Sequence, residues 1–311
     1  MKANIDLTRR ETLTLAAATG IAVAASTLPA RAQSSGILAR KIPSSGEMLP
    51  VVGIGTAIIF DFDKSDKTKL DERAEVIKAL VAGGGRLIDT APSYGLAEDR
   101  LGDLFAMTGL RDRIFLAGKV RVASRDDTVA EMKASFAKMK IDRIDLMQLH
   151  NVRDANQNLD LLREWKKSGL CKYIGITSSF DRDYSAVEQT LKREKPDFFQ
   201  IDYSMVDRNS EERLIPAAAD SGCAILTNLP FGRGKFFQKV AGKPLPDFAK
   251  EIEVTSWAQY ALKWLLGNPA INGVIPGTDK PQYMVDNLKA GLGPLPDAAL
   301  RKRMLDHFEQ L

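Results

Sequence analysis

Short apolar runs alternate with amphipathic stretches from residue 51 to the end of the chain. The runs are rich in β-branched residues and have the length of buried strands. They cover residues 51–56, 86–90, 114–120, 145–150, 173–178, 198–203, 224–228 and 273–277. Their regular spacing predicts parallel strands that are joined by helices.

Helical periodicity fills the segments between the apolar runs. The predicted helices cover residues 71–82, 96–107, 127–139, 156–168, 184–193, 211–221 and 254–266. Val129, Met132, Phe136 and Met139 recur at three- and four-residue spacing after the capping residue Asp127, which is typical of a helix with one buried face. The two patterns together indicate eight β/α units.

Eight β/α units in one domain predict an α/β fold, a (β/α)8 TIM barrel. A doubly wound open sheet is the alternative, but its glycine-rich dinucleotide fingerprint is missing, because the run Gly53-Ile54-Gly55-Thr56 lacks a third glycine and a following helix. Residues 38–50 predict a short hairpin that caps the bottom of the barrel. The barrel domain is predicted over residues 33–311.

The longest gap between strands covers residues 229–253. It contains three glycines together with Arg233, Lys235, Lys239 and Lys243. Loops of this length in compact domains are usually functional or disordered. We expect a mobile basic flap that covers a ligand on the active face, with disorder as the alternative.

The first 32 residues resemble an export signal. Arg9 and Arg10 precede an uncharged, largely small and aliphatic stretch over residues 12–28, and Ala30-Arg31-Ala32 is typical of a cleavage site. The paired arginines resemble a twin-arginine signal, which predicts a twin-arginine translocase as partner and a periplasmic location. The alternative is an uncleaved anchor helix, but a bilayer needs roughly 20 strongly apolar residues.

Charge and cysteine content exclude several classes of partner. The chain has 311 residues and a net charge of +4. Residues 1–32 carry four basic and two acidic side chains, so the remaining 279 residues carry +2. This balance predicts no nucleic acid and no stable membrane association. Cys171 and Cys223 precede non-neighbouring strands, and we expect both to be buried and unpaired.

Candidate catalytic residues end three successive strands. Asp89 ends the second strand, Tyr94 follows it in a loop, Lys119 lies near the end of the third strand, and His150 ends the fourth. Taken alone, Lys119 reads as a lysine that reaches solvent and His150 as a structural histidine. The C-terminal ends of barrel strands meet at one face, however, so the four side chains are expected to lie together.

The four residue types suit protonation of an oxygen atom. A phenol has a pKa of about 10, so Tyr94 needs a neighbour to tune it. A lysine held by Asp89 is expected to lower the pKa of Tyr94, and a neutral histidine can hydrogen-bond and orient a carbonyl oxygen.

From about residue 41 to residue 287 the chain resembles the aldo-keto reductases. The matching pieces are Gly55-Thr56, Asp89-Thr90-Ala91-Pro92-Ser93-Tyr94-Gly95, Gly118-Lys119, Leu149-His150, Gly175-Ile176-Thr177-Ser178, Gln200-Ile201-Asp202, Ile275-Pro276-Gly277-Thr278 and Asp286-Asn287. The resemblance implies reduction of an aldehyde or ketone with a nicotinamide cofactor. It also implies that Tyr94 is the general acid, that Lys119 tunes it, that Asp89 holds Lys119, and that His150 positions the carbonyl.

The resemblance also implies a set of cofactor-binding positions. They are Gly55, Thr56, Thr177, Ser178, Gln200, Asn228, Leu229, Phe231, Gly232, Gly277, Thr278, Lys280, Tyr283 and Asn287. Gln200 matches a contact to the nicotinamide carboxamide, and Ser178 stands where the family usually has asparagine. Asn228 stands where the family has a tyrosine that stacks under the nicotinamide, and Phe231 is the candidate to compensate.

The site for a 2′-phosphate departs from the family as well. Many members have a lysine and an arginine where this chain has Gly277 and Tyr283. Thr278-Asp279-Lys280-Pro281 nevertheless predicts a helix start, whose free N–H groups favour phosphate, and Lys280 can add a charge. Asn287 matches an adenine contact. We therefore favour NADP(H), with NAD(H) as the alternative.

Two alternatives to a simple reductase stay open. Because free reduced nicotinamide is not expected outside the cytoplasm, the protein can retain its cofactor and act as an epimerase or dismutase. It can also be a non-catalytic nicotinamide-binding protein. A metal-dependent hydrolase lacks paired histidine ligands, so we expect no metal. We expect a monomer that acts on a small carbonyl substrate.

Overall fold

The computed structural model describes residues 36–311 except 122–123 and 153–158. Eight parallel strands form one sheet, in which each strand pairs with its neighbours along the chain. The strands are β3 (Ile54–Gly55), β4 (Leu87–Asp89), β5 (Phe115–Arg121), β6 (Ile144–His150), β7 (Cys171–Ser178), β8 (Phe198–Asp202), β9 (Ala224–Asn228) and β10 (Ile271–Val274). The eight predicted runs are thus confirmed as strands, with small differences at their ends.

The sheet closes into a barrel between its first and last strands. Parallel bridges join Val52 to Val274 and Gly55 to Gly277, and the Gly53 N–H donates to the Val274 carbonyl at 2.9 Å. A Cβ on Gly53 would lie 2.7 Å from Leu87, so glycine permits this close backbone approach. The predicted (β/α)8 barrel is confirmed.

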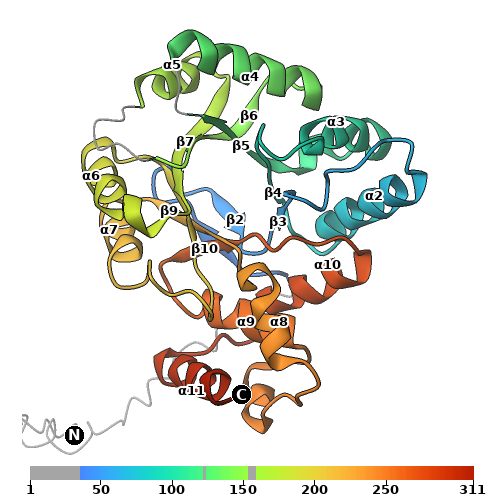
Figure 1. The fold of residues 1–311 in the computed structure, drawn as a ribbon, viewed down its shortest axis with the longest axis vertical. Helices are drawn as coiled ribbons and strands as arrows, with labels where there is room; N and C mark the ends of the chain where they lie inside the picture. Colours follow the sequence, from blue (N-terminus) through green and yellow to red (C-terminus); the bar gives the residue numbers. More distant parts are fainter. Residues whose placement is uncertain (1–35, 122–123, 153–158) are drawn as a thin grey trace, which may run out of the picture. The chain divides into compact units, whose positions relative to one another are not determined.

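Helices surround the strands, as Figure 1 shows. They are α2 (Lys67–Ala82), α3 (Ala97–Thr108), α4 (Arg125–Met139), α5 (Asp160–Ser168), α6 (Tyr184–Glu194), α7 (Leu214–Asp220), α9 (Trp257–Leu266) and α10 (Pro281–Leu288). Helix α4 begins two residues before its predicted start, because Ser124 caps it and donates to the Asp127 carboxylate at 2.6 Å. Part of the helix predicted over 156–168 lies outside the described residues.

The barrel interior changes from apolar to polar along the strands. Near the N-terminal ends of the strands, the interior is a cluster of buried apolar and aromatic side chains that includes Phe115, Tyr173 and Phe198. Towards the C-terminal ends, the buried side chains include Lys119, Gln148 and Gln200. Polar groups are costly to bury without partners, so this upper layer is the part of the core that needs a functional explanation.

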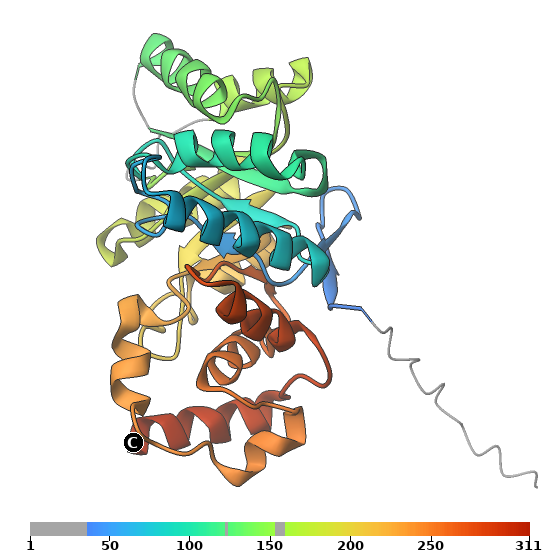
Figure 2. The same cartoon turned by 90° about the vertical axis from the view of Figure 1, so that its right-hand side faces the viewer.

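The predicted hairpin forms and covers the apolar end of the barrel. Strands β1 (Ala39–Lys41) and β2 (Met48–Pro50) pair antiparallel, and Ile42 and Leu49 join the interior apolar cluster. The Tyr173 hydroxyl lies 2.7 Å from Ser45 Oγ in the turn of the hairpin. Figure 2 shows the hairpin at one end of the barrel. Its position leaves the opposite, polar end for function.

The segment after β9 differs from its prediction. Instead of an open flap, residues 235–252 contain α8 (Lys235–Val240) and the 3-10 helix η4 (Asp247–Ile252). Phe236 in α8 is buried and stacks on Phe308 at 5.0 Å between ring centroids. Phe308 belongs to α11 (Ala298–Gln310), which lies beside this segment in Figure 2. These residues are therefore helical rather than an open loop, and they pack against the C-terminal helix. Their role in covering a ligand stays a prediction.

Both cysteines are free and buried, as predicted. Burial raises the pKa of each thiol to about 12, so neither is a reactive thiolate near neutral pH.

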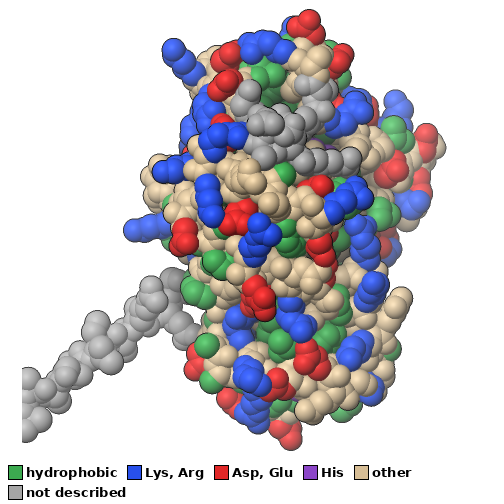
Figure 3. Space-filling model, turned by 60° about the vertical axis from the view of Figure 1, so that its left-hand side comes forward, with side chains coloured by type: hydrophobic (Ala, Val, Ile, Leu, Met, Phe, Trp, Pro, Cys, Tyr) green, Lys and Arg blue, Asp and Glu red, His purple; other side chains and the backbone are tan. Residues whose placement is uncertain are grey.

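In the described part of the chain, no helix has the length and apolar character needed to cross a membrane. On the face shown in Figure 3, basic and acidic side chains are interspersed.

Candidate active site

The C-terminal ends of β4 and β5 bring a lysine and a carboxylate together. Lys119 Nζ lies 2.8 Å and 2.7 Å from the two oxygens of Asp89, and it also donates to the Thr90 carbonyl at 3.0 Å. The exposed fraction is 1% for Lys119 and 2% for Asp89. The predicted contact is thus confirmed as a buried ion pair whose ammonium group has three acceptors.

Tyr94 and His150 complete the predicted group. Lys119 Nζ lies 5.0 Å from the centroid of the Tyr94 ring. The rings of Tyr94 and His150 meet edge to face at 6.0 Å between centroids. The structure therefore brings all four residues together at the C-terminal end of the barrel, on three successive strands and one loop.

A tight turn fixes the backbone on both sides of Tyr94. The Tyr94 N–H donates to the Ala91 carbonyl, and the Ala97 N–H donates to the Tyr94 carbonyl, each at 3.1 Å. Gly95 has a φ of +59°, and a Cβ there would lie 2.3 Å from the Asp61 carboxylate. Only glycine fits this turn. The turn places Tyr94 over the lysine and starts α3.

The electrostatics keep the lysine charged and the phenol protonated. Burial alone lowers the pKa of Lys119, but Asp89 and Tyr94 together raise it above its ordinary value. Burial also raises the pKa of Tyr94, although Lys119 acts in the opposite direction. The prediction that the lysine lowers the pKa of Tyr94 is therefore right for its contribution and wrong for the net shift, because desolvation of the phenolate is larger.

A chain of side-chain hydrogen bonds crosses the barrel beside the ion pair. Gln148 Nε2 donates to Gln200 Oε1 at 2.8 Å, and Gln200 Nε2 donates to Asn228 Oδ1. Asn228 Nδ2 in turn donates to Asp202 Oδ1 at 3.1 Å. Burial raises the pKa of Asp89, and the neighbouring amides of Gln200 and Gln148 oppose that rise, as Lys119 does. The network begins at Gln148, which pairs in register with Lys119, and it includes Gln200 and Asn228, two of the predicted nicotinamide contacts.

Gln148 and Asp202 are two members of this network that carry no predicted role. Gln148 is the only polar residue within the apolar run Leu146-Met147-Gln148-Leu149. Asp202 follows Gln200 by two residues, a spacing that puts both side chains on the same face of a strand. The signal that could have identified both residues is a polar side chain on the interior face near the end of a strand.

The amide of Asn228 has a different setting from the one its family position implies. It bridges Gln200 and Asp202, and Ser179 Oγ donates to the same Asp202 oxygen at 3.2 Å. The predicted aromatic substitute, Phe231, packs on Phe237 at 4.7 Å between ring centroids. Asn228 is therefore part of a polar network.

The hydroxyl-bearing candidates include buried groups with no partner. Ser178 Oγ and Thr56 Oγ1 are buried and have no hydrogen-bond partner among the described residues. Thr177 Oγ1 instead accepts from the Asn151 N–H at 2.9 Å. Buried hydroxyls without partners are uncommon, so Ser178 and Thr56 fit positions where a bound polar ligand supplies the missing contact.

The candidates after β10 form a second group. Gly277 has open space, since a Cβ there would meet nothing closer than Ile59 at 3.8 Å. Asn287 Nδ2 donates to Thr278 Oγ1 at 3.0 Å, and both are buried. Helix α10 begins with Pro281 after its N-cap Lys280, as predicted.

Lys280 and Tyr283 lie at the surface near this helix start. Lys280 forms an ion pair with Glu72 in α2, so its charge is already partly compensated. Tyr283 is 57% exposed. Neither Lys280 nor Tyr283 is buried in a pocket that is already shaped for a phosphate group.

The candidates after β9 lie in a strained turn. Leu229 and Gly232 have φ values of +47° and +54°, and the Gly232 N–H donates to the Leu229 carbonyl at 2.7 Å. A Cβ on Gly232 would lie 1.9 Å from Val206. Backbone strain of this kind is concentrated at functional sites.

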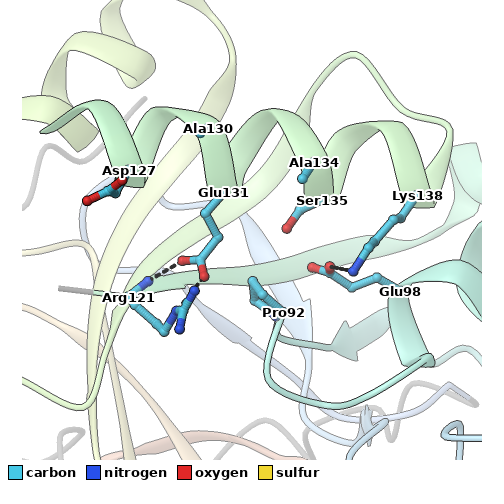
Figure 4. Close-up of a pocket in the computed structure, with 9 residues that line it drawn as sticks. All are labelled: Pro92, Glu98, Arg121, Asp127, Ala130, Glu131, Ala134, Ser135 and Lys138. Carbon is cyan, nitrogen blue, oxygen red and sulfur yellow. Dashed lines mark hydrogen bonds and ion pairs between the residues drawn. The ribbon is translucent and has the colours of Figure 1, made fainter. Parts of the chain in front are cut away.

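A separate cavity of about 670 Å³ lies between α4, the end of β5 and the loop that precedes Tyr94. Figure 4 shows its two ion pairs, Arg121 with Glu131 and Lys138 with Glu98. Glu98 is 1% exposed, and neither of its carboxylate oxygens has a hydrogen-bond partner within the described structure. Burial accordingly raises the pKa of Glu98.

Across residues 36–311, leaving out the two undescribed gaps, no cluster of side chains is suited to a metal ion.

Comparisons with known proteins agree with this geometry. A model of the Aldo/keto reductase family matches residues 51–302. Aldo-keto reductase str7 of Strobilurus tenacellus is 28% identical over 275 residues, which cover 75% of this chain and 81% of the relative. Aldo-keto reductase YhdN of Bacillus subtilis is 26% identical over 253 residues, which cover 67% of this chain and 75% of the relative.

Solved structures show the same fold. The thermostable aldo-keto reductase Tm1743, solved with the inhibitor epalrestat, has a TM-score of 0.70 at 25% identity, and the match covers 88% of this chain and all of that one. An aldo-keto reductase from Klebsiella pneumoniae, solved in complex with NADPH, has a TM-score of 0.69 at 20% identity and covers 85% of this chain and 92% of that one. The family match spans all eight barrel strands and the four clustered side chains.

Proposed function

The chain belongs to the aldo/keto reductase family of oxidoreductases, and from this premise we propose that it reduces the carbonyl group of an aldehyde or ketone with Tyr94 as general acid. The observation that carries the proposal is the buried Lys119–Asp89 ion pair beneath Tyr94, with His150 at its edge. The fold by itself hosts many activities, whereas this group of side chains has one evident use.

The four residues divide the work of proton transfer. The Tyr94 hydroxyl donates its proton to the carbonyl oxygen as negative charge develops there. The charged Lys119 stabilises the phenolate that remains, and Asp89 holds the lysine in place. A neutral His150 orients the carbonyl by a hydrogen bond. When bound, a nicotinamide cofactor supplies the hydride.

We propose NADP(H) as the cofactor, with NAD(H) as the alternative. The residues present fit a bound dinucleotide, because Ser178 and Thr56 bear buried hydroxyls without described partners. Gly277 leaves open space, and α10 begins beside it with a proline. The complex of the Klebsiella pneumoniae relative with NADPH supports the choice. The full set of binding positions is the one that the family resemblance implies.

Replacing Tyr94 by phenylalanine tests the assignment. Tyr94→Phe removes only the hydroxyl, so turnover of a carbonyl panel should be abolished while the Kd for NADP(H) is largely kept. The matched control is Tyr173→Phe, which removes the hydroxyl of a tyrosine at the opposite end of the barrel and should retain activity. Normal turnover in Tyr94→Phe would end the assignment.

We further propose that the twin-arginine translocase exports the folded protein to the periplasm with its cofactor already bound. The support is the pair Arg9-Arg10 ahead of the uncharged stretch of residues 12–28. This export makes a retained cofactor that cycles within each turnover, as in an epimerase or dismutase, the second candidate function. Mass spectrometry and absorbance of protein purified from the exported fraction decide between them, because an empty site of weak affinity rules out the retained cofactor.

A non-catalytic nicotinamide-binding protein is the remaining candidate. The feature that favours it is Asn228 in place of a stacking aromatic residue, together with the altered phosphate site. Binding of NADP(H) without conversion of any carbonyl in a broad panel would support this function over the reductase.

A further inference from the structure

Asp202 is a carboxylate at the polar end of the barrel with no role in the proton transfer described above. It is the last residue of β8, and its Oδ1 accepts from Asn228 Nδ2 at 3.1 Å and from Ser179 Oγ at 3.2 Å. Within the described residues, both hydrogen bonds reach the same oxygen. Burial raises the pKa of Asp202, and the two donors oppose that rise because they favour the charged form.

Asp202 lies in the same hydrogen-bond network as Gln200. Burial is the main cause that raises the pKa of Tyr94, and the negative charge of Asp202 adds to that rise. The hydrogen-bond network Gln148–Gln200–Asn228 connects Asp202 to the position beside Lys119, because Gln148 pairs in register with that lysine. Arg233 is the cation that lowers the pKa of Asp202, and Asp207 is a neighbouring acid.

We propose that Asp202 is a cofactor-positioning residue that makes the protein bind the oxidised nicotinamide dinucleotide more tightly than the reduced one. This inference rests on the proposed function, because it assumes that the nicotinamide ring lies beside Gln200 and Asn228. Asn228 is then a bridge that fixes the Asp202 carboxylate and connects it to Gln200.

The physical reason is the charge of the ring. The oxidised nicotinamide ring carries a positive charge and the reduced ring is neutral, so a nearby carboxylate attracts only the oxidised form. Because the barrel mouth is partly desolvated, this attraction is stronger than it would be in bulk water. Differential binding of this kind lowers the reduction potential of the bound couple and makes the reduced cofactor a better hydride donor.

The same reasoning explains why an amide stands at position 228. An aromatic ring there would offer Asp202 no N–H donor, and the carboxylate would lose one of its two hydrogen bonds. A partly buried charge is stabilised by such hydrogen bonds. Asn228 and Asp202 therefore form a matched pair.

The test measures the Kd for NADP+ and for NADPH separately, by calorimetry and by cofactor fluorescence. Asp202→Asn removes the charge and nearly preserves the shape. It should raise the Kd for NADP+ about tenfold relative to the Kd for NADPH. Asp207→Asn is the control, because it removes a neighbouring charge whose carboxylate accepts from the Asn209 N–H instead. The control should leave the ratio of the two Kd values unchanged.

The outcomes separate this inference from the proposed function. If the wild-type protein binds both forms and Asp202→Asn leaves the ratio unchanged, the role of Asp202 is refuted while the reductase survives. If the wild-type protein binds neither form, both fall. Circular dichroism verifies folding. If Asp202→Asn does not fold, Asp202→Ser removes the charge and offers Asn228 a hydroxyl oxygen as acceptor. The same rise in the Kd for NADP+ relative to the Kd for NADPH is then expected.

Discussion

The buried pair of Lys119 and Asp89 ties activity and stability to the same two side chains. Each is almost fully buried, and each is the principal partner of the other. Removing one member of such a pair leaves an uncompensated charge, which costs about 3–5 kcal/mol. The pair therefore has to be dissected with single and double substitutions.

Lys119→Met should lower kcat by about 10²-fold or more and destabilise the fold. Burial raises the pKa of Asp89 and Lys119 opposes that rise, so without the lysine Asp89 takes up a proton more readily in the folded state. A raised folded pKa contributes stability that is present at low pH and lost as pH rises through it. The variant should thus regain stability on acidification, as measured by urea unfolding at several pH values.

The double variant Asp89→Asn/Lys119→Met separates the two effects. It should recover much of the lost stability at neutral pH, because no buried charge remains. It should not recover turnover, since the phenolate still lacks a cation. If the double variant is as unstable as Lys119→Met, the loss of stability comes from the packing of the lysine side chain and not from the unpaired charge.

Single residues also show where sequence reasoning reaches its limit. Asp89, Tyr94, Lys119 and His150 could be predicted because each sits at a strand end or in the adjoining loop, where a parallel barrel gathers side chains. The hydrogen-bond partners of Asn228 could not be predicted from the sequence. Its bonds to Gln200 and Asp202 depend on how the interior faces of β8 and β9 align, and the sequence showed only that an expected tyrosine was absent.

At the scale of elements, the contact between α3 and α4 contains a carboxylate that has a distant ion pair but no hydrogen-bond partner among the described residues. Glu98 in α3 is 1% exposed, and Lys138 in α4 approaches it only to 3.9 Å (Figure 4). Its pKa is raised by burial, so its contribution to stability is present below the ordinary value of 4.5 and is lost as pH rises through the folded pKa.

Glu98→Gln should accordingly raise the free energy of unfolding at pH 7 by about 1 kcal/mol, and the gain should vanish towards pH 4.5. Chemical denaturation at both pH values measures it. The control is Glu131→Gln in the same cavity, which breaks the hydrogen-bonded pair with Arg121 and should give no gain. A gain that is independent of pH would contradict the explanation.

Elements differ in how far the sequence predicted them. The strands were predicted because a buried parallel strand is a continuous apolar run, whatever its neighbours are. Helices α8 and η4 were not, because Phe236 and Ile252 are held by tertiary contacts with distant segments. Glycines and lysines dominated that stretch of sequence and suggested a loop instead.

At the scale of the whole molecule, Lys263 connects helix α9 to the segments before and after it in the C-terminal part of the chain. Its ammonium group donates to the carbonyls of Ile252, Leu292 and Pro294 at 2.7, 2.7 and 3.0 Å. Burial lowers the pKa of Lys263 from 10.5 to about 8. A lowered folded pKa means that the unfolded chain binds more protons between these values, so stability from this group rises across that range.

Lys263→Met should destabilise the protein by about 1–3 kcal/mol, because three backbone carbonyls lose their donor. The stability of the wild type relative to the variant should increase between pH 8 and pH 10.5. Guanidinium unfolding across this range measures the difference. A difference that falls with rising pH would show that the lysine is charged throughout and that its ion-dipole contacts outweigh burial.

Cofactor binding should be visible in the stability of the whole barrel. The proposed positions come from both ends of the sheet, with Thr56 after β3 and Gly277 after β10, and from Gln200 on β8 between them. Gly277 bridges to Gly55 where the sheet closes. A ligand that bridges them stabilises only the folded state, by about 2.7 kcal/mol at a concentration of 100 Kd. For a domain of this size the melting temperature should rise by about 5 °C. Equal concentrations of NADP+ and NAD+ compare the two cofactors directly, and a larger rise with NAD+ would overturn the preference for NADP(H).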